Sequence, residues 1–484
     1  MDRRTFLAAT IAAALAMRHA RAASTPSPAV PRASRPRRIV IVGAGLAGLC
    51  AAHELGNAGH DVVVLEASRR AGGRVRTWRD FADGLLGEAG AARIPPNHDL
   101  TLGYAGAFGL SAEPFYPERG DASMVFGRDV VRYPIDGEPD LAQLKLPLTA
   151  RERTMGYGKL ADATLAPLAA LAGDDLASDA WPPPALAKLD RYTLREWLTE
   201  QGWSDASIRL TSVGWEDREG EWFGLLWLVR EILMSPTSGG ALVRITGGND
   251  QLPQAFARAL AGRIRYGHEV VALAQDERGV EIRVRGRDEP FRADRAIVTV
   301  PFSVLRGIAI ESPIGASKRR AIEQMPYIPL SRVALQVRGR DWLPRGANGF
   351  AQTDLPSEIW LLTHAARASR DIVQVYLKGN ASQQAAAMSE PERLRYAIEH
   401  VNGVFPGFRD AVEGGVSVCW ESEPWARGAH AALAPGQTTT LLRHVATPEG
   451  RFHFAGEHAS PYHGWMQGAL HAARRAAAEV AAAT

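Results

Sequence analysis

The sequence predicts a mixed α/β fold, and three observations support this prediction. An apolar, β-branched strand at residues 38–42 leads into a glycine-rich turn, an Ala/Leu helix and a second strand at 62–66. Helical spacing dominates the stretch from residue 110, and strands return after residue 242. The chain ends in a strand, another glycine-rich turn and a long Ala-rich helix. Together these patterns predict a Rossmann-like domain built from discontinuous segments, with an inserted α+β domain and a helical subdomain.

Each region takes its own part of the 484-residue chain, which is long enough for several packed cores. We expect the Rossmann-like domain to combine residues 38–109, 237–305 and 440–484. Residues 110–236 are predicted to form the helical subdomain, and 306–439 an α+β domain that binds the substrate.

Local patterns predict the individual elements. Residues 158–173 read as an Ala/Leu helix, and Thr193 with Glu196 forms a capping box that opens another helix. Helical spacing continues through 221–234, whose apolar residues, Trp222 included, are expected in the core. Further strands are predicted at 264–266, 269–274, 280–285 and 295–300 and within 306–425.

Composition and charge set limits on function. Apolar residues make up 46% of the chain and charged residues 23%, as in soluble globular enzymes. The formal net charge of +3 comes from the first 22 residues, so no basic surface for nucleic acid is expected. Cys50 and Cys419 have no metal-ligand spacing, and no metal site is predicted. Whether the two cysteines pair is left open.

Residues 1–22 are predicted to be a targeting segment. The apolar stretch at 6–17 is too short to span a bilayer, and residues 20–22 (Ala-Arg-Ala) are typical of a cleavage site. Residues 3–7 (Arg-Arg-Thr-Phe-Leu) resemble the twin-arginine signal of proteins that are exported after folding, with a plain secretory signal as the alternative. We expect a periplasmic or secreted protein without a stable membrane span, in which residues 23–37 form a flexible leader.

A glycine fingerprint, Gly-Ala-Gly-Leu-Ala-Gly, follows the first strand. Gly43 permits the tight turn, Gly45 lets the backbone approach a pyrophosphate, and Gly48 lets the helix and the strand pack closely. The N-terminus of the helix offers free N–H groups and a positive dipole end to phosphates. The turn therefore predicts dinucleotide binding.

Two further features extend this prediction. Glu66 closes the second strand, 23 residues after Gly43, where an acid can bond the ribose hydroxyls. Gly73 and Arg74 follow closely, and a second glycine turn with an arginine would hold the diphosphate from the other side.

These motifs resemble the flavin-dependent amine oxidase family. The resemblance rests on residues 38–78, 454–457 (Phe-Ala-Gly-Glu) and 464–469 (Gly-Trp-Met-Gln-Gly-Ala), and it covers most of the chain from residue 38. It implies an FAD cofactor, with Glu457 near the pyrophosphate and Trp465 facing the substrate. The implied FAD-binding residues are Gly43, Gly45, Ala47, Gly48, Glu66, Ala67, Gly73, Arg74, Gly90, Ala91, Ala92, Arg93, Val270, Glu457, Gly464, Trp465, Met466 and Ala469.

Within that family the sequence is most similar to L-amino-acid oxidases. Residues 90–95 (Gly-Ala-Ala-Arg-Ile-Pro) resemble the segment that runs along the flavin and presents an arginine to the substrate carboxylate. The planar guanidinium of Arg93 suits this role because it can pair with a carboxylate through two hydrogen bonds. Residues 353–357 (Thr-Asp-Leu-Pro-Ser) resemble another segment of these oxidases, and Val270 stands where the family's backbone contacts adenine.

Three positions depart from the family pattern. Residues 358–362 contain no tyrosine, although these oxidases use one there to help hold the carboxylate. Arg332 stands where the family usually places a lysine near flavin N5, and the two cations are not equivalent. Ala429 stands where relatives carry a tyrosine or a flavin-linked cysteine, so FAD is expected to be non-covalent. His430 and His458 are expected to face solvent, with a role as active-site groups as the alternative.

The resemblance implies oxidation of an L-amino acid, with Arg93, Arg332 and Trp465 as the candidate catalytic residues. Hydride transfer to the flavin would leave an imine, which hydrolyses to a 2-oxo acid and ammonia while oxygen is reduced to hydrogen peroxide. One alternative is an oxidase of an amine without a carboxylate, and another is a dehydrogenase that uses a different electron acceptor. A third is a non-catalytic protein that binds flavin or a partner. The substrate side chain is not readable, and a homodimer is left open.

Overall fold

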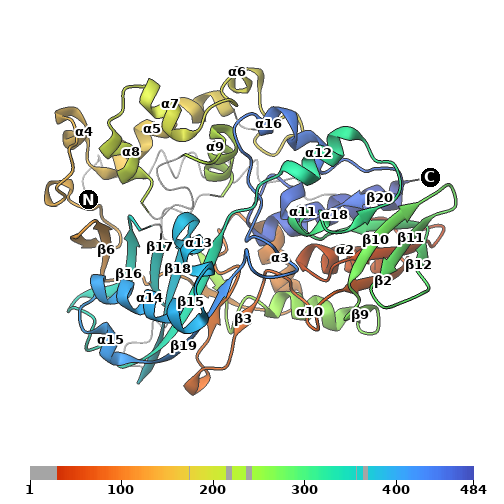
Figure 1. Cartoon of the computed structure of the whole chain (residues 1–484), viewed down its shortest axis with the longest axis horizontal. Coiled ribbons are helices and arrows are strands. Elements are labelled where there is room, and N and C mark those ends of the chain that lie inside the picture. The colour runs from red at the N-terminus through yellow and green to blue at the C-terminus, as the bar shows by residue number, and fades with distance from the viewer. Residues whose placement is uncertain are drawn as a thin grey trace.

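Three regions make up the molecule in the computed structural model (Figure 1). A parallel sheet with its helices lies on the right, a large antiparallel sheet on the lower left, and a group of helices along the top. The structure describes residues 30–173, 175–213, 221–235, 242–355, 357–362 and 369–483. The predicted fold class is confirmed, whereas the exact domain boundaries stay predictions. The predicted targeting segment and the first part of the leader lie outside the described residues.

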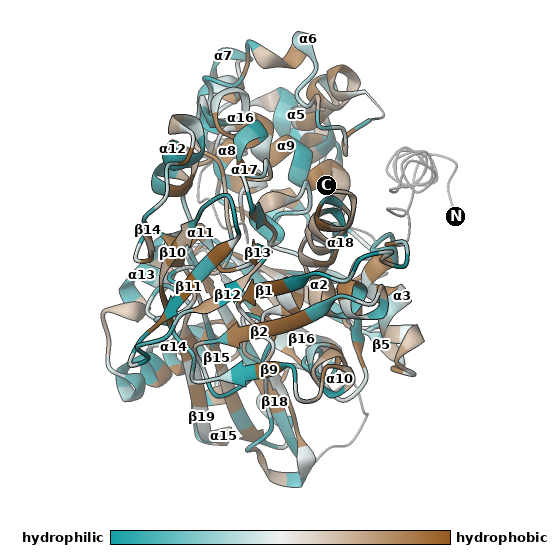
Figure 2. Cartoon of the chain, turned by 90° about the vertical axis from the view of Figure 1, so that its right-hand side faces the viewer, coloured by the Kyte–Doolittle hydropathy of each residue, from teal (hydrophilic) through white to brown (hydrophobic). Residues whose placement is uncertain are grey.

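Five parallel strands form the first sheet. Their order is β20 (Phe452–Phe454), β13 (Arg295–Val298), β1 (Arg38–Val42), β2 (Asp61–Glu66) and β9 (Ile264–Tyr266). The strand order reverses at β1, where a parallel sheet opens a crevice beyond the carboxyl ends of its strands. Figure 2 shows β1 and β2 side by side and strongly hydrophobic, as expected for strands with both faces covered.

Helices from both ends of the chain cover this sheet. α2 (Leu46–Asn57) packs against α18 (Met466–Ala482), and both contribute buried alanines to the main core. α3 (Asp99–Ala107) and α10 (Gln251–Ala259) complete this side. Cys50 lies in α2, and both it and Cys419 are buried and free.

The large sheet has seven strands, antiparallel except where β6 and β16 pair in parallel. Their order is β19 (Val412–Cys419), β15 (Leu330–Arg338), β18 (Arg370–Lys378), β17 (Ser357–Leu361), β16 (Ala347–Thr353), β6 (Asp121–Phe126) and β7 (Asp129–Pro134). α14 (Glu390–Val404) and α15 (Phe408–Ala411) pack their apolar side chains against Val333, Leu335 and Val337. Because side chains alternate along a strand, Arg332 projects from the opposite face.

The expectation that residue 110 opens a helical region is wrong for its first part. β5 (Ala112–Pro114), β6 and β7 precede the helices, and β6 and β7 form a hairpin at the edge of the large sheet. The hairpin forms because Met124 and Val131 lie opposite one another and are buried. Two apolar, β-branched runs separated by Gly127-Arg128 are the hairpin signal in the sequence.

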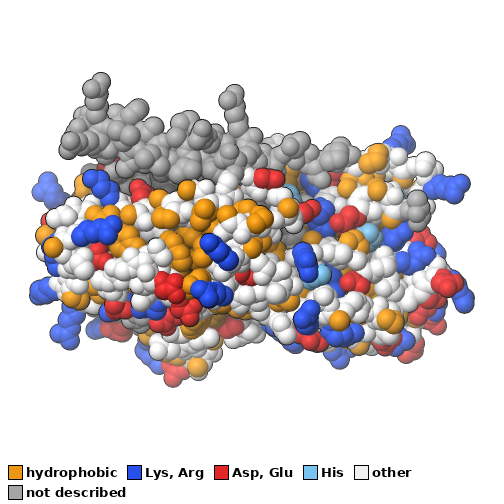
Figure 3. Space-filling model, turned by 90° about the horizontal axis from the view of Figure 1, so that it is seen from above, with side chains coloured by type: hydrophobic (Ala, Val, Ile, Leu, Met, Phe, Trp, Pro, Cys, Tyr) orange, Lys and Arg blue, Asp and Glu red, His pale blue; other side chains and the backbone are white. Residues whose placement is uncertain are grey.

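The helices along the top form the helical region. They are α4 (Ala150–Met155), α5 (Tyr157–Ala172), α6 (Pro184–Ala187), α7 (Leu194–Glu200), α8 (Asp205–Thr211) and α9 (Leu225–Met234). The predicted capping box of Thr193 and Glu196 opens α7. Leu225 and Leu226 are buried as expected, but Trp222 lies before α9 and is 39% exposed. On the face seen from above, apolar side chains gather between scattered charged groups of both signs (Figure 3).

The remaining elements are β3 (Thr77–Trp78), β4 (Gly87–Glu88), β8 (Val243–Ile245), β10 (Val270–Gln275), β11 (Val280–Val284), β12 (Phe291–Ala293), α11 (Phe302–Leu305), β14 (Ala309–Ile310), α12 (Ala316–Gln324), α13 (Gly379–Ala386), α16 (Gln437–Thr440) and α17 (Leu442–Val445). Their strands form a four-stranded sheet in the order β12, β11, β10 and β14, and two-stranded sheets of β3 with β4 and of β8 with β5. No helix within the described ranges has the length and apolar character needed to cross a bilayer.

Candidate active site

The turn after β1 has the geometry that its glycines predict. Gly43 has a φ of +104°, which favours glycine, and a Cβ added at Gly48 would lie 1.9 Å from the Gly43 carbonyl oxygen. A Cβ added at Gly45 would instead meet no heavy atom beyond its chain neighbours within 4 Å. Gly48 therefore serves packing between helix and strand, whereas Gly45 leaves the backbone open to whatever lies beside it.

Glu66 is fixed at the edge of this turn. Its carboxylate accepts hydrogen bonds from the backbone N–H of Ala44 at 2.7 Å and from that of Ser68 at 2.8 Å. Both bonds hold the side chain at the carboxyl end of β2, where the crevice opens.

A cavity of about 1340 Å³ runs from this turn to the large sheet. It exceeds the ~300–1,000 Å³ of ordinary small-molecule pockets, so it has room for a dinucleotide together with a substrate. Every predicted FAD-binding residue and every candidate catalytic residue lies on its wall except Gly48. Gly48 is corrected from a cofactor contact to a packing residue.

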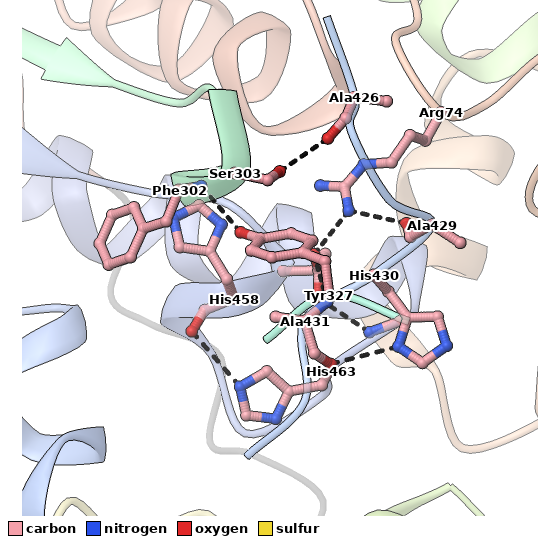
Figure 4. Close-up of polar contacts among 12 residues, drawn as sticks. Arg74, Phe302, Ser303, Tyr327, Ala426, Ala429, His430, Ala431, His458 and His463 are labelled. Carbon is pink, nitrogen blue, oxygen red and sulfur yellow. Dashed lines mark hydrogen bonds and ion pairs between the residues drawn. The ribbon is translucent and has the colours of Figure 1, made fainter. Parts of the chain in front are cut away.

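Glu457 ties the turn at the other end of the chain to this cavity. Figure 4 shows Arg74 reaching toward Ala429 beside this turn. The Glu457 carboxylate accepts hydrogen bonds from Arg74 Nη1 at 2.7 Å and from the Gly464 N–H at 3.0 Å. Arg74 Nη1 also donates to the Ala429 carbonyl oxygen at 2.8 Å. Burial raises the pKa of Glu457, but Arg74 and the neighbouring groups together outweigh burial and lower it to about 2. Three distant chain segments thus meet around one buried ion pair.

The expectation that His430 and His458 face solvent is wrong. His458 is completely buried, with its ring packed against Phe302, and burial lowers its pKa to about 3. His430 lies half-buried on the cavity wall. No local pattern indicated either position, because segments far away in the chain cover His458 completely and His430 in part.

His463 links the rear turn to the helical region. Its Nδ1 accepts a hydrogen bond from Trp227 Nε1 at 3.1 Å, so the ring proton sits on Nε2, which faces the His458 carbonyl oxygen at 3.3 Å. Burial lowers the pKa of His463 to about 4, in keeping with a neutral ring. The next aromatic residue, Trp465, donates from Nε1 to Glu231 on α9 at 2.5 Å. Two hydrogen bonds therefore hold α9 against the rear turn.

The large sheet presents a row of polar side chains to the other end of the cavity. Arg332 on β15 lies opposite Tyr376 on β18, which in turn lies opposite Glu358 on β17. Lys378 stands two residues after Tyr376 and therefore projects from the same face. All four side chains line the cavity.

Glu358 joins two cations of this row. Its carboxylate lies 2.9 Å from Arg93 Nη1 and 2.6 Å from Lys378 Nζ. Burial would raise the pKa of Glu358, but the two neighbouring cations lower it to about 2. The hydroxyl of Tyr116 lies 2.6 Å from Arg93 Nη1 as well, so Arg93 is held by two groups through one nitrogen.

Arg332 is held by aromatic rings. Its guanidinium lies 3.6 Å from the ring centre of Tyr376 and 4.5 Å from that of Trp360, and the residue is only 5% exposed. Its buried Nη1 has no hydrogen-bond partner within the described part of the chain. Burial lowers the pKa of Arg332. A buried cationic N–H group on a cavity wall is suited to an anion.

Sequence reasoning missed several of these residues. Glu358, Lys378, Tyr376 and Tyr116 gave no motif, although Tyr376 and Lys378 show the two-residue spacing of one strand face. Residues 358–362 lack the tyrosine of the family pattern, but Tyr376 and Tyr116 line the same cavity from other parts of the chain. Of the segment 353–357, Pro356 lies outside the described residues. No group of three or more His, Cys, Asp or Glu side chains in the described ranges could hold a metal ion.

The geometry fits a flavin dinucleotide in its general features. The Gly45 backbone is open to the cavity, the N-terminus of α2 lies beside it, and Glu66 and Arg74 flank the turn. The polar row of the large sheet lies at the other end of the same space.

Comparisons with known proteins agree with this geometry. YobN of Bacillus subtilis, named as a candidate L-amino-acid oxidase, is 32% identical over 457 residues, covering 92% of this chain and 95% of that protein. The flavin-dependent L-tryptophan oxidase RebO of Lentzea aerocolonigenes is 30% identical over 470 residues, covering 90% and 96%. Cyclohexylamine oxidase from Brevibacterium oxydans superposes with a TM-score of 0.78 over 92% of this chain and 99% of that one; at 23% identity this likeness concerns the fold.

The family model described as flavin containing amine oxidoreductase matches residues 46–481, which is nearly the whole described chain. The relatives include L-amino-acid oxidases, while the structural neighbours include amine oxidases. The ion pair at the rear turn and the polar sheet face lie within the matched residues, and the match begins at residue 46, directly after Gly45 of the glycine turn. The protein is an oxidoreductase of the flavin containing amine oxidoreductase family.

Proposed function

We propose that this protein uses non-covalent FAD to oxidise the C–N bond of an L-amino acid. One observation carries the proposal, namely the charge of the cavity wall at the large sheet. Among its described residues, Arg93, Arg332 and Lys378 are cations and Glu358 is the carboxylate between two of them. This excess of positive charge suits a substrate with a carboxylate.

The same contacts suggest how the cofactor is held. Gly43 and Gly45 would receive the pyrophosphate, Glu66 the ribose, and Val270 the adenine, with Glu457 and Arg74 bracing the rear turn. Ala429 supports non-covalent binding because its methyl side chain cannot form the bond that a cysteine forms. When bound, the flavin accepts a hydride from the carbon that carries the amine.

The chain's own residues would orient the substrate. Among the described residues Arg93 makes its hydrogen bonds through Nη1, which leaves Nη2 and Nε for the two oxygens of a carboxylate. Arg332 would add a third donor through its unpartnered Nη1. Trp465, held by Glu231, would close the cavity beside the amine and exclude water.

A second candidate is the oxidation of an amine without a carboxylate. It is supported by the fold shared with cyclohexylamine oxidase and by Glu358, which already partners Arg93. In that case the Arg93–Glu358 pair would be structural, and the aromatic lining would select the amine.

The electron acceptor and the cellular compartment complete the proposal. Oxygen is proposed as the electron acceptor, with another acceptor as the alternative for a site in which Arg332 replaces the usual lysine. Export to the periplasm is proposed on the arginine pair near the N-terminus. Hydrogen peroxide formation and the N-terminal residue of the exported protein test these two points.

The main experiment uses the purified flavin-loaded protein. L-Amino acids and simple amines are mixed with it while bleaching of the flavin absorbance and peroxide are followed. Arg93→Ala should raise KM for amino acids about 10- to 100-fold, because a charged hydrogen-bond pair contributes roughly 1.5–3 kcal/mol. Glu358 keeps Lys378 as its partner in this variant. Arg292→Ala, an exposed ion-pair residue, is the matched control.

The two candidates give different results. Bleaching by amino acids, with a KM that depends on Arg93, supports the proposal. Bleaching by amines alone, or an Arg93→Ala variant with unchanged KM, favours the second candidate.

A further inference from the structure

The two walls of the cavity carry opposite charge. The wall at the large sheet holds three cations, Arg93, Arg332 and Lys378, and one carboxylate, Glu358, so its net charge is positive. The wall formed by the helical region holds the carboxylates Asp162 on α5 and Glu231 on α9. No lysine or arginine from the described part of residues 157–235 lines the cavity. Among the described lining residues, the two walls that would flank a substrate therefore differ in the sign of their net charge.

Glu231 lies at the substrate end of the cavity. Its Oε1 accepts a hydrogen bond from Trp465 Nε1 at 2.5 Å, and Trp465 belongs to the turn expected beside the flavin ring. The end of α9 is also tied to the segment that follows Arg93. Asn97 Nδ2 donates to the Met234 carbonyl oxygen at 2.9 Å, three residues after Glu231.

The wall around Glu231 is mostly apolar. Phe223, Trp227, Leu228 and Ile232 line the cavity from the same helix and the residues just before it. Such a wall accommodates a chain of methylene groups, and the aromatic rings also attract a cation. A carboxylate in this setting is only weakly hydrated, so an unlike charge brought to it is bound more strongly than in water.

We infer that the substrate is an L-amino acid with a cationic side chain, such as lysine. This inference rests on the proposed function. The α-carboxylate would meet Arg93 and Arg332, the side-chain methylenes would pack against the apolar wall, and the side-chain ammonium would meet Glu231. Asp162, nearer the solvent, would add attraction at the cavity rim. The bond that breaks remains the Cα–H bond beside the α-amine, so the side-chain amine is bound and not oxidised.

An acidic amino acid would find a favourable partner only on the cationic wall. Its second carboxylate would have to point toward Asp162 and Glu231, because the first already occupies the arginines. Like charges at that distance disfavour binding.

The test compares three substrates of similar shape on the flavin-loaded enzyme. L-Lysine and L-norleucine have the same carbon chain and differ in the terminal ammonium, while L-glutamate carries a second carboxylate. We expect kcat/KM for lysine to exceed that for norleucine about 10-fold or more, as for a charged hydrogen bond in a partly buried site. Glutamate should be the poorest of the three.

The matched variants are Glu231→Gln and Glu200→Gln. Glutamine keeps an oxygen that accepts the Trp465 hydrogen bond but loses the charge, so the lysine-to-norleucine ratio should fall roughly 10-fold or more toward unity. Glu200 lies at the end of α7, exposed and off the cavity, and its variant should leave the ratio unchanged.

Each outcome has a separate meaning. Three results would overturn this inference while leaving the proposed function in place. They are a lysine-to-norleucine ratio of kcat/KM near one in the wild type, a preference for glutamate, and a ratio that Glu231→Gln does not change. Bleaching by amines without carboxylates, and by no amino acid, overturns the proposed function itself. If Glu231→Gln fails to fold, the inference is tested by the wild-type ratio and by the Asp162→Asn variant. In Asp162→Asn the lysine-to-norleucine ratio should fall, but by less than is expected for Glu231→Gln.

Discussion

Replacing Glu358 by glutamine tests whether the polar row of the large sheet is a true charge cluster. The Glu358 carboxylate lies 2.9 Å from Arg93 Nη1 and 2.6 Å from Lys378 Nζ, and its side chain is 5% exposed. Glutamine preserves the shape but leaves two buried cations without their shared anion. Removing one partner of a buried ion pair costs about 3–5 kcal/mol, so we expect the free energy of unfolding to fall by roughly 3 kcal/mol or more.

The matched control is Glu281→Gln. Glu281 lies 2.7 Å from Arg292, a similar distance, but both side chains are well exposed. Exposed pairs contribute about 0–1 kcal/mol, so this variant should lose little. Both free energies come from chemical denaturation of flavin-saturated protein. Equal losses in the two variants, or a loss below about 1 kcal/mol in Glu358→Gln, would refute the charge-cluster reasoning.

The pH dependence gives a second readout for the same variant. Arg93 and Lys378 lower the pKa of Glu358 from 4.5 to about 2. A lowered carboxyl pKa stabilises the folded state above the unfolded pKa, and this stabilisation is lost as the pH falls toward the folded value. The difference in free energy of unfolding between the wild type and Glu358→Gln should therefore become smaller as the pH falls below about 4.5.

Three further predictions follow from other parts of the structure. Gly48→Ala places a Cβ 1.9 Å from the Gly43 carbonyl oxygen and should destabilise the fold by about 1–3 kcal/mol in denaturation, whereas Gly45→Ala should leave stability unchanged and lower the flavin content seen by absorbance. Burial raises the pKa of Glu88 to about 7, so the folded state of the wild type loses stability as the pH rises from the unfolded pKa toward this value. The melting temperature of Glu88→Gln should therefore rise relative to that of the wild type between about pH 5 and pH 8. A difference in melting temperature that stays constant over this range would contradict the prediction. Glu457→Gln breaks the buried pair at the rear turn, so it should cost about 3 kcal/mol and release flavin on gel filtration; a fully coloured variant would argue against it.

The parts of the fold that local chemistry dictates could be predicted from the sequence. Gly43 needs a positive φ and Gly48 has no room for a Cβ, so the fingerprint follows from backbone geometry alone. The capping box of Thr193 and Glu196 is likewise local, because its two hydrogen bonds join residues three apart. Such features need no knowledge of the rest of the chain.

The substrate wall could not be predicted in this way. Arg332, Tyr376 and Glu358 meet only because three strands pair in a particular register, and their sequence neighbours do not reveal it. His458 is a similar case, since Phe302 from a distant segment covers its ring. The β6–β7 hairpin was missed for another reason: its turn signal was present, but the helical spacing of the residues after it dominated the prediction.

The order of strands in the parallel sheet determines when this protein can finish folding. β20 at residues 452–454 pairs with β13, which lies beside β1 at residues 38–42, and α18 at the chain's end packs on α2 near its start. A ribosome must therefore have synthesised residues 452–454, more than 400 residues after β1, before the sheet gains its last strand. Contacts of such long sequence separation fold slowly. If flavin binds to both turns as proposed, its capture must follow the synthesis of the rear turn, and a chain that lacks residues 452–482 would have neither β20 nor α18 to complete the site.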